Sequence, residues 1–334
     1  MHATTPATHK LLRSLAAMIF ISSFLIGTSA THTELTPQFL QAVGDYGPWK
    51  EPRAEFNAFL ANSPSITGHY NIPGPNISAS ANSSRSVTEA PIGGWATIGG
   101  WSWSIHVAAD LPLEHSKLNL DFSQGPLYYA GLRLALNAPS SLVGNEGNLT
   151  VDDDWQMCVY QWSLRNVSYP RQLRTDDGTC GSVLSDQCIA DIENAAAPMI
   201  QENCRCPVLS TIPSCRDHAD GINVFDSECS ASFFNASRIR GSEWEDGKLE
   251  IWGLGDDATH HAGNDTAYNR IGSLSWPAMV GFSNGQHWTA SLACVRATDT
   301  IPGTKVPIDE SSGNSLGCSW AQTGLAVLVF MLIL

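Results

Sequence analysis

The stretch "WSWSIHV", residues 101–107, alternates large apolar side chains with small or polar ones. Its odd-numbered positions, from Trp101 to Val107, are tryptophan, isoleucine or valine, and the positions between them are two serines and a histidine. Successive side chains of a strand point to opposite faces, so a period of two predicts a strand with one buried face. Such alternation is typical of antiparallel sheets that have one face toward water.

Two segments that follow have the same period. "KLNLDF", residues 117–122, predicts a strand that buries Leu118, Leu120 and Phe122. "YYAGLRLAL", residues 128–136, predicts a longer strand of the same kind. The three stretches together predict an antiparallel sheet.

Two later segments predict β-hairpins from the residues at their turns. Asp246-Gly247 and Asn284-Gly285 each separate two alternating runs, and both pairs are favoured in tight type I′ turns. Residues 281–285 also match the G-x-S-x-G pattern of an esterase nucleophile elbow, in which a helix follows the serine. The next segment here alternates as a strand, so the sequence favours a hairpin turn over a nucleophile.

The cysteines indicate a disulfide framework with one dense segment. That segment runs from Cys180 to Cys229, and within it Ser185 is a predicted N-cap for a helix with apolar residues every three to four positions. Cys158 and Cys294 lie outside it in strand-like runs, and we expect them to pair. An even set of cysteines in an oxidising compartment predicts that all are oxidised. The eight are Cys158, Cys180, Cys188, Cys204, Cys206, Cys215, Cys229 and Cys294.

These patterns predict a mainly β fold, an antiparallel β-sandwich or jelly roll with a disulfide-rich helical insertion. We place the sandwich domain at residues 95–298 and the insertion at about residues 180–229. Residues 31–94 hold short helical signals broken by prolines, and then a run rich in Pro, Ser, Asn and Gly. We therefore expect an N-terminal arm and a glycosylated linker before the domain.

The first thirty residues are predicted to be a signal peptide. Lys10 and Arg13 precede an apolar run of about a dozen residues, which ends in small residues at Ala30. The run is shorter than the roughly 20 residues that a membrane-spanning helix needs. We expect residues 1–30 to be removed and the protein to be secreted.

The C-terminal segment has the three parts of a glycosylphosphatidylinositol (GPI) attachment signal. Small residues surround Ser312, a mostly polar spacer follows, and residues 324–334 are apolar without interruption. We expect Ser312 to carry the lipid, residues 299–312 to form a stalk, and residues 313–334 to be removed together with the ninth cysteine, Cys318. The alternatives for this tail are a poorly formed membrane helix and a buried C-terminal strand.

The segment between the two predicted end signals has several glycosylation sequons and a strongly negative charge. Six N-x-S/T sequons fit a secretory route. The same segment holds all 32 acidic residues and 16 of the 18 basic ones, a formal charge of −16, and it has no basic run. We therefore expect no nucleic-acid partner, and we expect no cofactor. The sequons are at Asn76, Asn82, Asn148, Asn166, Asn235 and Asn264.

The stretch "GLGDDATHHAGND", residues 253–265, holds the side chains most like metal ligands. Carboxylates and imidazoles bind divalent cations. However, the sequon at Asn264 would place a glycan beside them, and adjacent histidines of a strand point to opposite faces. The sequence favours a solvated loop and leaves a weak divalent-metal site as the alternative. The four candidate ligands are Asp256, Asp257, His260 and His261.

Tryptophans beside acidic residues indicate a candidate carbohydrate site. Trp244, Trp252 and Trp288 are the candidates for a sugar-binding surface, because exposed aromatic faces stack on sugars. The acidic residues from Glu243 to Glu250 flank the first two, and paired carboxylates are the catalytic groups of glycosidases. Spacing in the sequence does not fix the distance between such carboxylates, so hydrolysis stays an alternative to binding.

Several motifs along the chain, taken together with the two end signals, are typical of a known class of proteins. "DDDWQMCVYQW" (residues 152–162), "LSDQC" (residues 184–188), the cysteine-rich stretch to Cys215 and the two end signals cover under a third of the chain. In these features the chain resembles GPI-anchored surface glycoproteins of filamentous fungi that have no assigned activity. The resemblance implies a location and no particular chemistry.

We therefore expect a cell-surface or cell-wall glycoprotein, held by a GPI lipid, with carbohydrate binding as its candidate activity and cell-wall polysaccharide as its candidate partner. No motif fixes a catalytic reaction, so a non-enzymatic role is favoured. The alternative is a glycoside hydrolase on the same β-sandwich.

Overall fold

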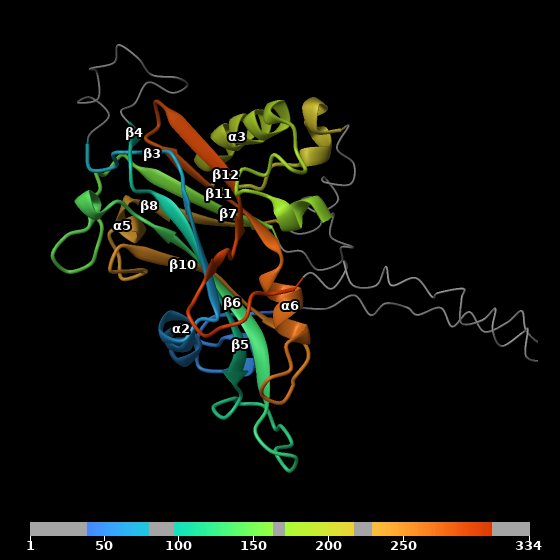
Figure 1. Ribbon diagram of the computed structural model, residues 1–334. Helices are drawn as coiled ribbons and strands as arrows, with labels where there is room; N and C mark the ends of the chain where they lie inside the picture. The colour runs from blue at the N-terminus through green and yellow to red at the C-terminus, as the bar shows by residue number, and fades with distance from the viewer. Residues whose placement is uncertain (1–38, 80–96, 163–170, 217–228, 309–334) are drawn as a thin grey trace, which may run out of the picture. The chain divides into compact units, whose positions relative to one another are not determined.

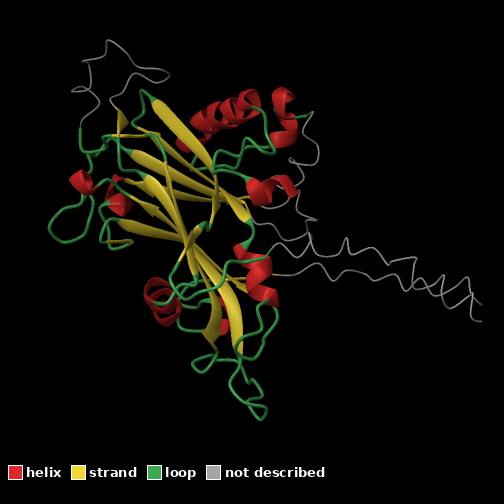
Figure 2. Cartoon of the chain, viewed as in Figure 1, coloured by secondary structure: helices red, strands yellow, loops and turns green. Residues whose placement is uncertain are grey.

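The computed structural model describes residues 39–79, 97–162, 171–216 and 229–308, and this part of the chain is mainly β (Figures 1 and 2). The strands are β1 (Phe39–Gln41), β2 (Ile66–Asn71), β3 (Gly74–Pro75), β4 (Thr97–Ile98), β5 (Ser102–Pro112), β6 (Tyr128–Asn137), β7 (Gln156–Trp162), β8 (Cys229–Asn235), β9 (Trp244–Glu245), β10 (Lys248–Asp256), β11 (Ser275–Ser283), β12 (Trp288–Arg296) and β13 (Asp299–Thr300). The α-helices are α2 (Arg53–Asn62), α3 (Asp186–Gln201), α5 (Ala236–Ile239) and α6 (Thr266–Gly272). The 3-10 helices are η1 (Pro48–Lys50), η2 (Ser140–Leu142), η3 (Arg171–Thr175), η4 (Leu209–Thr211) and η5 (Pro213–Cys215).

Two antiparallel sheets hold most of these strands. The larger has the order β1-β10-β6-β5-β2-β13, with β9 added beside β10, and the smaller has the order β12-β11-β7-β8. Each pairing in the two sheets is antiparallel, as the alternation of residues 101–107 predicts.

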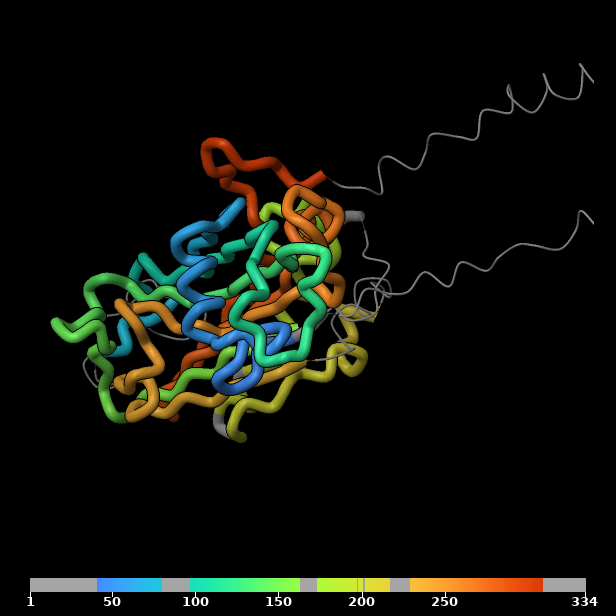
Figure 3. The backbone as a smooth tube through the Cα atoms, turned by 90° about the horizontal axis from the view of Figure 1, so that it is seen from below, coloured from blue at the N-terminus to red at the C-terminus, as the bar shows by residue number. Residues whose placement is uncertain are grey.

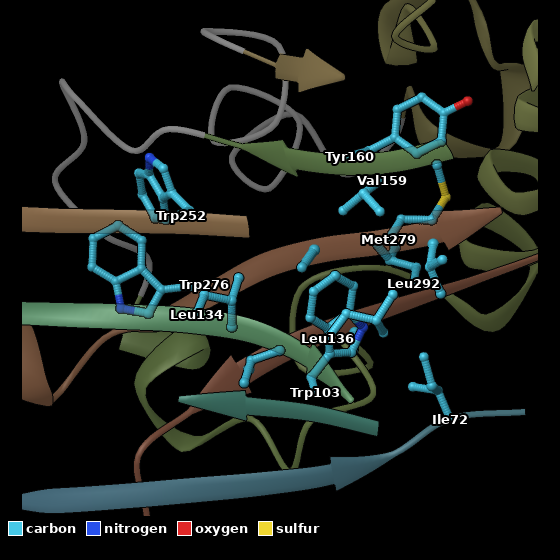
Figure 4. Packing of buried hydrophobic residues seen from close by; sticks show 14 of the residues in the cluster. Ile72, Trp103, Leu134, Leu136, Val159, Tyr160, Trp252, Trp276, Met279 and Leu292 are labelled. Atoms are coloured by element: carbon cyan, nitrogen blue, oxygen red, sulfur yellow. The ribbon is translucent and has the colours of Figure 1, made fainter. Parts of the chain in front are cut away.

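The two sheets share one core, which confirms the predicted sandwich. Trp101 and Trp103 are fully buried, as the alternation requires. The ring centroid of Trp101 lies 4.8 Å from that of Phe282 in the smaller sheet. Trp252 of β10 and Trp276 of β11 meet in the same way, with centroids 5.0 Å apart, and Figure 4 shows this pair within the core.

A helix covers the outer face of each sheet. α3 packs on β11 and β12, and α2 packs on β5 and β6 (Figure 1). The hydroxyl of Ser185 accepts a hydrogen bond from the amide of Cys188 at 3.2 Å, which confirms the predicted N-cap of α3. Ile192, Ala196 and Ile200 of α3 are buried, so the insertion packs on the smaller sheet and joins the same buried cluster.

All eight of these cysteines are in disulfides, as predicted, but the predicted pair Cys158–Cys294 is wrong. β11 lies between β7, which holds Cys158, and β12, which holds Cys294. Neighbouring strands are about 4.8 Å apart, so strands with one between them exceed the roughly 7 Å that a disulfide spans. The bonds are Cys158–Cys204, Cys180–Cys294, Cys188–Cys215 and Cys206–Cys229.

Both predicted hairpins are confirmed, and one of the two has the predicted turn. Between β9 and β10, Asp246 has φ 49° and Gly247 has φ 74°, the pair of positive values that a type I′ turn needs. Ser283 pairs with Trp288 across the other hairpin, so its connection is longer than a two-residue turn. No helix follows Ser283, as the hairpin interpretation of residues 281–285 requires.

The strand predicted at residues 117–122 is wrong. These residues lie in the connection between β5 and β6, and Phe122 is 42 % exposed. The amide of Lys117 bonds to the carbonyl of Lys50, and the amide of Leu118 bonds to the hydroxyl of Ser116. These backbone donors therefore bond to a 3-10 helix and to a nearby side chain instead of a neighbouring strand.

The domain boundary predicted at residue 95 is also wrong. β1 pairs with β10, and β2 pairs with β5 from Ile66 opposite Val107 to Asn71 opposite Ser102. Prolines break helices, but they do not prevent short strands from joining the edge of a sheet. The segment predicted to be an arm therefore belongs to the sandwich from residue 39 onward.

The first ten residues of the predicted stalk are docked on the domain. β13 pairs with β2, the hydroxyl of Tyr268 donates to the carbonyl of Lys305 at 2.6 Å, and the amide of Ile308 donates to Asn269 at 2.9 Å. Residues 309–312, the predicted signal peptide (1–30) and the predicted propeptide (313–334) lie outside the described residues. In the described ranges, no helix is both long and apolar enough to cross a bilayer.

Candidate functional site

A pocket of about 410 Å³ lies beside α2 on the outer side of the larger sheet. We call it the α2 pocket. Figure 3 shows the segment of α2 beside the connection from β5 to β6, which forms the other wall. Its lining residues are Glu51, Glu55, Phe56, Ala58, Phe59, Asn62, Ser63, Leu111, Pro112, Glu114, His115 and Tyr129.

A β-bulge in β5 places Leu111, a residue of the pocket lining, on the outer face of the sheet. Ala108 pairs with Gly131 and Leu111 pairs with Tyr129, so three steps along β5 oppose two along β6. Without the extra residue, Leu111 would share the inner face with Val107. The bulge instead places Leu111 with Tyr129 and Phe56 in a small cluster under α2.

A strained turn brings Glu51 to the pocket. Trp49 has φ 57° and Lys50 has φ 54°, and neither is a glycine. Left-handed backbone at such residues costs of order 1–3 kcal/mol and persists only where neighbours hold it. Here the indole of Trp49 donates to the carbonyl of Asp256 at 2.8 Å, and the hydroxyl of Ser116 donates to the carbonyl of Trp49 at 2.6 Å.

Two glycines of β10 let this turn and α2 approach the sheet. A Cβ at Gly253 would lie 2.6 Å from Cε1 of Phe56, and a Cβ at Gly255 would lie 2.5 Å from Cβ of Pro48. Real Cβ atoms essentially never come within 3.0 Å of a neighbour, so only glycine fits here without a shift. Gly253 and Gly255 therefore allow Phe56 and Pro48 to pack closely on the sheet beside the pocket.

Two buried polar groups line the pocket without partners. Glu51 is 3 % exposed and Tyr129 is fully buried. Within the described residues, neither Oε1 of Glu51 nor the hydroxyl of Tyr129 has a hydrogen-bond partner. Burial, with a smaller effect of Glu55 and Glu114, raises the pKa of Glu51 to about 7. Burial also raises the pKa of Tyr129, and the charge of Glu51 adds to the rise.

The rim of the pocket is acidic. Nε2 of His115 lies 3.2 Å from Oε2 of Glu55 and 3.4 Å from Oε1 of Glu114. All three of these side chains are about half exposed or more. The imidazole therefore bridges two carboxylates at the entrance, while Glu51 lies deeper.

The chain matches no protein-family model, no curated protein and no solved structure.

The four candidate metal ligands have protein partners, and the favoured interpretation of residues 253–265 as a solvated loop is wrong for Asp256, which ends β10 and is fully buried. Asp256 is fully buried and paired with Arg270, whose Nη2 also lies 3.6 Å from Asp257. Nε2 of His260 lies 3.0 Å from Oδ1 of Asp110, and Nδ1 of the exposed His261 lies 3.2 Å from the carbonyl of Pro126. Among the residues that the structure describes, no group of three or more His, Cys, Asp or Glu side chains could hold a metal.

Two of the three predicted sugar-binding tryptophans are in the core. Trp244 and Trp252 are each 3 % exposed, and both pack against other tryptophans, so their ring faces are closed to a ligand. The prediction for these two is wrong, because alternation in the hairpin turned them inward. Trp288 is the first residue of β12 and is partly buried.

Two of the acidic residues near those tryptophans, Glu243 and Glu250, have arginine partners. Glu243 receives two hydrogen bonds from Arg238, at 2.8 and 2.9 Å. Glu250 lies 2.6 Å from Nη1 of Arg133 on the outer face of the sheet. These carboxylates stabilise the hairpin and α2, and they do not form a pair across a groove.

Four of the predicted glycosylation sites are described, and none of them is buried. Asn235 and Asn264 are exposed, and Asn76 and Asn148 are partly exposed. Asn82, Asn166 and the predicted lipid attachment site Ser312 lie outside the described residues.

Sequence reasoning missed the α2 pocket, because it assigned residues 31–94 to an arm. A signal for it exists in "GPWKEP", residues 47–52, where a glutamate stands between two prolines beside a tryptophan. Its burial depends on the glycines of β10, some 200 residues later, and no local pattern reports that contact.

Proposed function

We propose that this protein is an extracellular glycoprotein, held at the cell surface by a GPI lipid, whose ectodomain binds a small ligand in the α2 pocket. The observation that carries the binding proposal is the pair of buried, unpaired polar groups on Glu51 and Tyr129. A buried polar atom without a partner costs about 1–3 kcal/mol. A ligand that pairs with both atoms would recover this free energy.

The size and lining of the pocket support the same proposal. Its volume of about 410 Å³ falls within the range of about 300–1,000 Å³ that is usual for small-molecule sites. Phe56, Phe59 and Leu111 supply the apolar wall that such sites have, and Glu51 and Tyr129 supply a few convergent polar groups.

Binding is tested by screening a fragment library against the purified protein by saturation-transfer NMR. Fragments that occupy the α2 pocket should bind the wild type and lose binding in Glu51→Gln and Tyr129→Phe. Glu146→Gln, which changes an exposed acid in a distant loop, is the matched control and should bind as the wild type does. Fragment binding that neither pocket variant changes would contradict the proposed site.

The four disulfides fit an oxidising, extracellular compartment and so support the proposed location. The anchor itself rests on the attachment signal around Ser312. Phosphatidylinositol-specific phospholipase C should release the protein from intact cells. Replacing Ser312, Gly313 and Asn314 with bulky residues should prevent surface display. A surface form that still contains the peptide 324–334 would contradict the anchor.

A second candidate function is glycoside hydrolysis at the same pocket. The raised pKa of Glu51, about 7, keeps part of this carboxyl protonated near neutral pH, beside the carboxylates of Glu55 and Glu114. A protonated carboxyl next to an ionised one is the arrangement that glycosidases use. A panel of p-nitrophenyl glycosides tests it. Turnover that Glu51→Gln abolishes would favour hydrolysis, and binding without turnover favours the first proposal.

A further inference from the structure

The charge of the α2 pocket is one-sided. Three carboxylates line it, those of Glu51, Glu55 and Glu114, and His115 is the one basic side chain in the lining. The whole segment between the predicted signals is also acidic, at −16. A concave site lined by one sign of charge attracts ligands of the opposite sign.

The two buried groups without partners, on Glu51 and Tyr129, can accept hydrogen bonds from a ligand. Oε1 of Glu51 is an acceptor when the carboxyl is ionised, and the hydroxyl oxygen of Tyr129 has lone pairs as well as one proton. An ammonium group offers three donors and no acceptor, so it has enough donors for both oxygens. Hydrogen bonds between a cation and a carboxylate are about twice as strong as neutral ones.

The aromatic wall fits the rest of such a ligand. Phe59 of α2 and Pro112 are partly exposed where they line the pocket, whereas Phe56 and Leu111 are each 2 % exposed. Aromatic faces attract cations that come within about 6 Å, and they also cover apolar groups. An apolar body attached to an ammonium group therefore matches both parts of the lining.

We propose that the α2 pocket binds a small organic amine, with its ammonium group on Glu51 and Tyr129 and its apolar body against Phe59. This inference rests on the proposed binding function and adds the class of ligand. Neutral sugars, the substrates of the second candidate function, are the competing ligands in the test.

The proposal implies that binding is linked to protons. The groups that act on Glu51 are His115 and Lys117, which favour its ionised form, and Glu55 and Glu114, which oppose it. Burial outweighs them and raises its pKa to about 7. A bound ammonium group favours the ionised carboxyl, so an amine has to displace the proton at pH 5 but not at pH 8. An alkylamine is cationic at both pH values, because the pKa of an alkylammonium group is near 10.4.

The experiment is isothermal titration calorimetry on the purified protein with three probes at pH 5 and pH 8. The probes are 2-phenylethylamine, its neutral analogue 2-phenylethanol, and methyl α-glucoside. We expect the amine to bind at least tenfold more tightly than the alcohol at pH 8. We expect this preference to fall at least fivefold at pH 5.

Variants then assign the effect to the pocket. Glu51→Gln should abolish the preference for the amine, and Glu146→Gln should leave it unchanged. Thermal unfolding checks that Glu51→Gln folds. If it does not fold, the fall in the amine preference of the wild type between pH 8 and pH 5 tests the proposal without the variant.

The failures of the two proposals are distinguishable. Equal binding of amine and alcohol, or tighter binding of the glucoside, would overturn the cation inference and leave the binding function standing. The absence of any pocket ligand, from these probes and from the fragment screen, would overturn both.

Discussion

Phe56 of α2 lies directly over Gly253 of β10, where a Cβ would stand 2.6 Å from Cε1 of the phenyl ring. The same ring reaches the neighbouring strand, since a Cβ at Gly131 would lie 3.4 Å from Cε2. Phe56 is 2 % exposed, so its ring is enclosed between α2 and the sheet. The position of α2, and of the pocket beside it, therefore depends on two residues without side chains.

Gly253→Ala should destabilise the protein by about 1–3 kcal/mol, because overpacking a tight contact forces side chains and backbone to shift. Urea unfolding measures this change. Gly99→Ala is the control, since nothing lies within 4 Å of its added Cβ. In a double-mutant cycle, Phe56→Leu should make part of the Gly253→Ala loss disappear. Strictly additive losses would mean that the ring and the glycine are not coupled.

Glu51→Gln should change how stability depends on pH. The pKa of this carboxyl rises from 4.5 to about 7 on folding, mainly through burial. The folded state thus holds the proton more tightly, and stability from Glu51 is lost as pH rises from about 4.5 to 7. At 1.36 kcal/mol per pKa unit the loss is about 3 kcal/mol, and glutamine removes it. Unfolding at pH 5 and pH 8 should show a smaller fall for Glu51→Gln than for the wild type or Glu146→Gln.

His106 should contribute a pH dependence of opposite sign. Its pKa is lowered from 6.5 by burial and, to a smaller extent, by the charges of Arg133 and Lys248. The ring is neutral under α2, with Nδ1 placed 2.9 Å from the carbonyl of Leu60. Stability from this group is present above pH 6.5 and is lost as pH falls further.

The variant His106→Gln keeps a donor for that carbonyl but has no group that titrates. Between pH 7 and pH 5 it should lose less stability than the wild type in urea unfolding. His69→Gln, at an exposed position of β2, is the matched control and should behave as the wild type does. An unchanged pH profile for His106→Gln would show that protonation of this ring does not limit stability.

The sandwich could be predicted because its main signals are local. Alternation from Trp101 to Val107 and turn residues such as Asp246 and Gly247 act within a few positions, and the structure has both as expected. The loop at residues 117–122 has the same alternation without a strand, because its amides found partners in η1 and Ser116. Period two is therefore necessary for such a strand but does not ensure it.

The α2 pocket could not be predicted, because it depends on three backbone features that contacts between distant parts of the chain produce. Tertiary packing sets each of them. They are the bulge that places Leu111 on the outer face, the left-handed turn before Glu51, and the close approach of α2 to the sheet at Gly253. The candidate metal ligands and the candidate sugar-binding tryptophans lie elsewhere for a related reason. Sequence shows which side chains exist, but the register of β10 decided that Trp252 faces the core and that Asp256 meets Arg270.

The disulfide framework leads to a further prediction, which compares a long closed loop with a short one. Cys180–Cys294 joins residues 114 apart and ties the start of the insertion to β12, whereas Cys206–Cys229 joins residues 23 apart. In the chain-entropy account, a cross-link stabilises by restricting the unfolded chain, and its effect grows with the length of the loop. The expected contributions are about 5 kcal/mol for the long loop and about 3 kcal/mol for the short one.

Burial widens the difference between the two bonds. Cys180 and Cys294 are fully buried, whereas Cys206 and Cys229 are partly exposed, so replacing the first pair also removes packed atoms from the core. The double variant Cys180→Ala/Cys294→Ala should therefore be less stable than Cys206→Ala/Cys229→Ala by at least about 1 kcal/mol. Urea unfolding of the two variants under non-reducing conditions measures this difference, and mass spectrometry confirms that the other three bonds are intact in each. Equal losses would show that neither loop length nor burial sets the contribution of these disulfides.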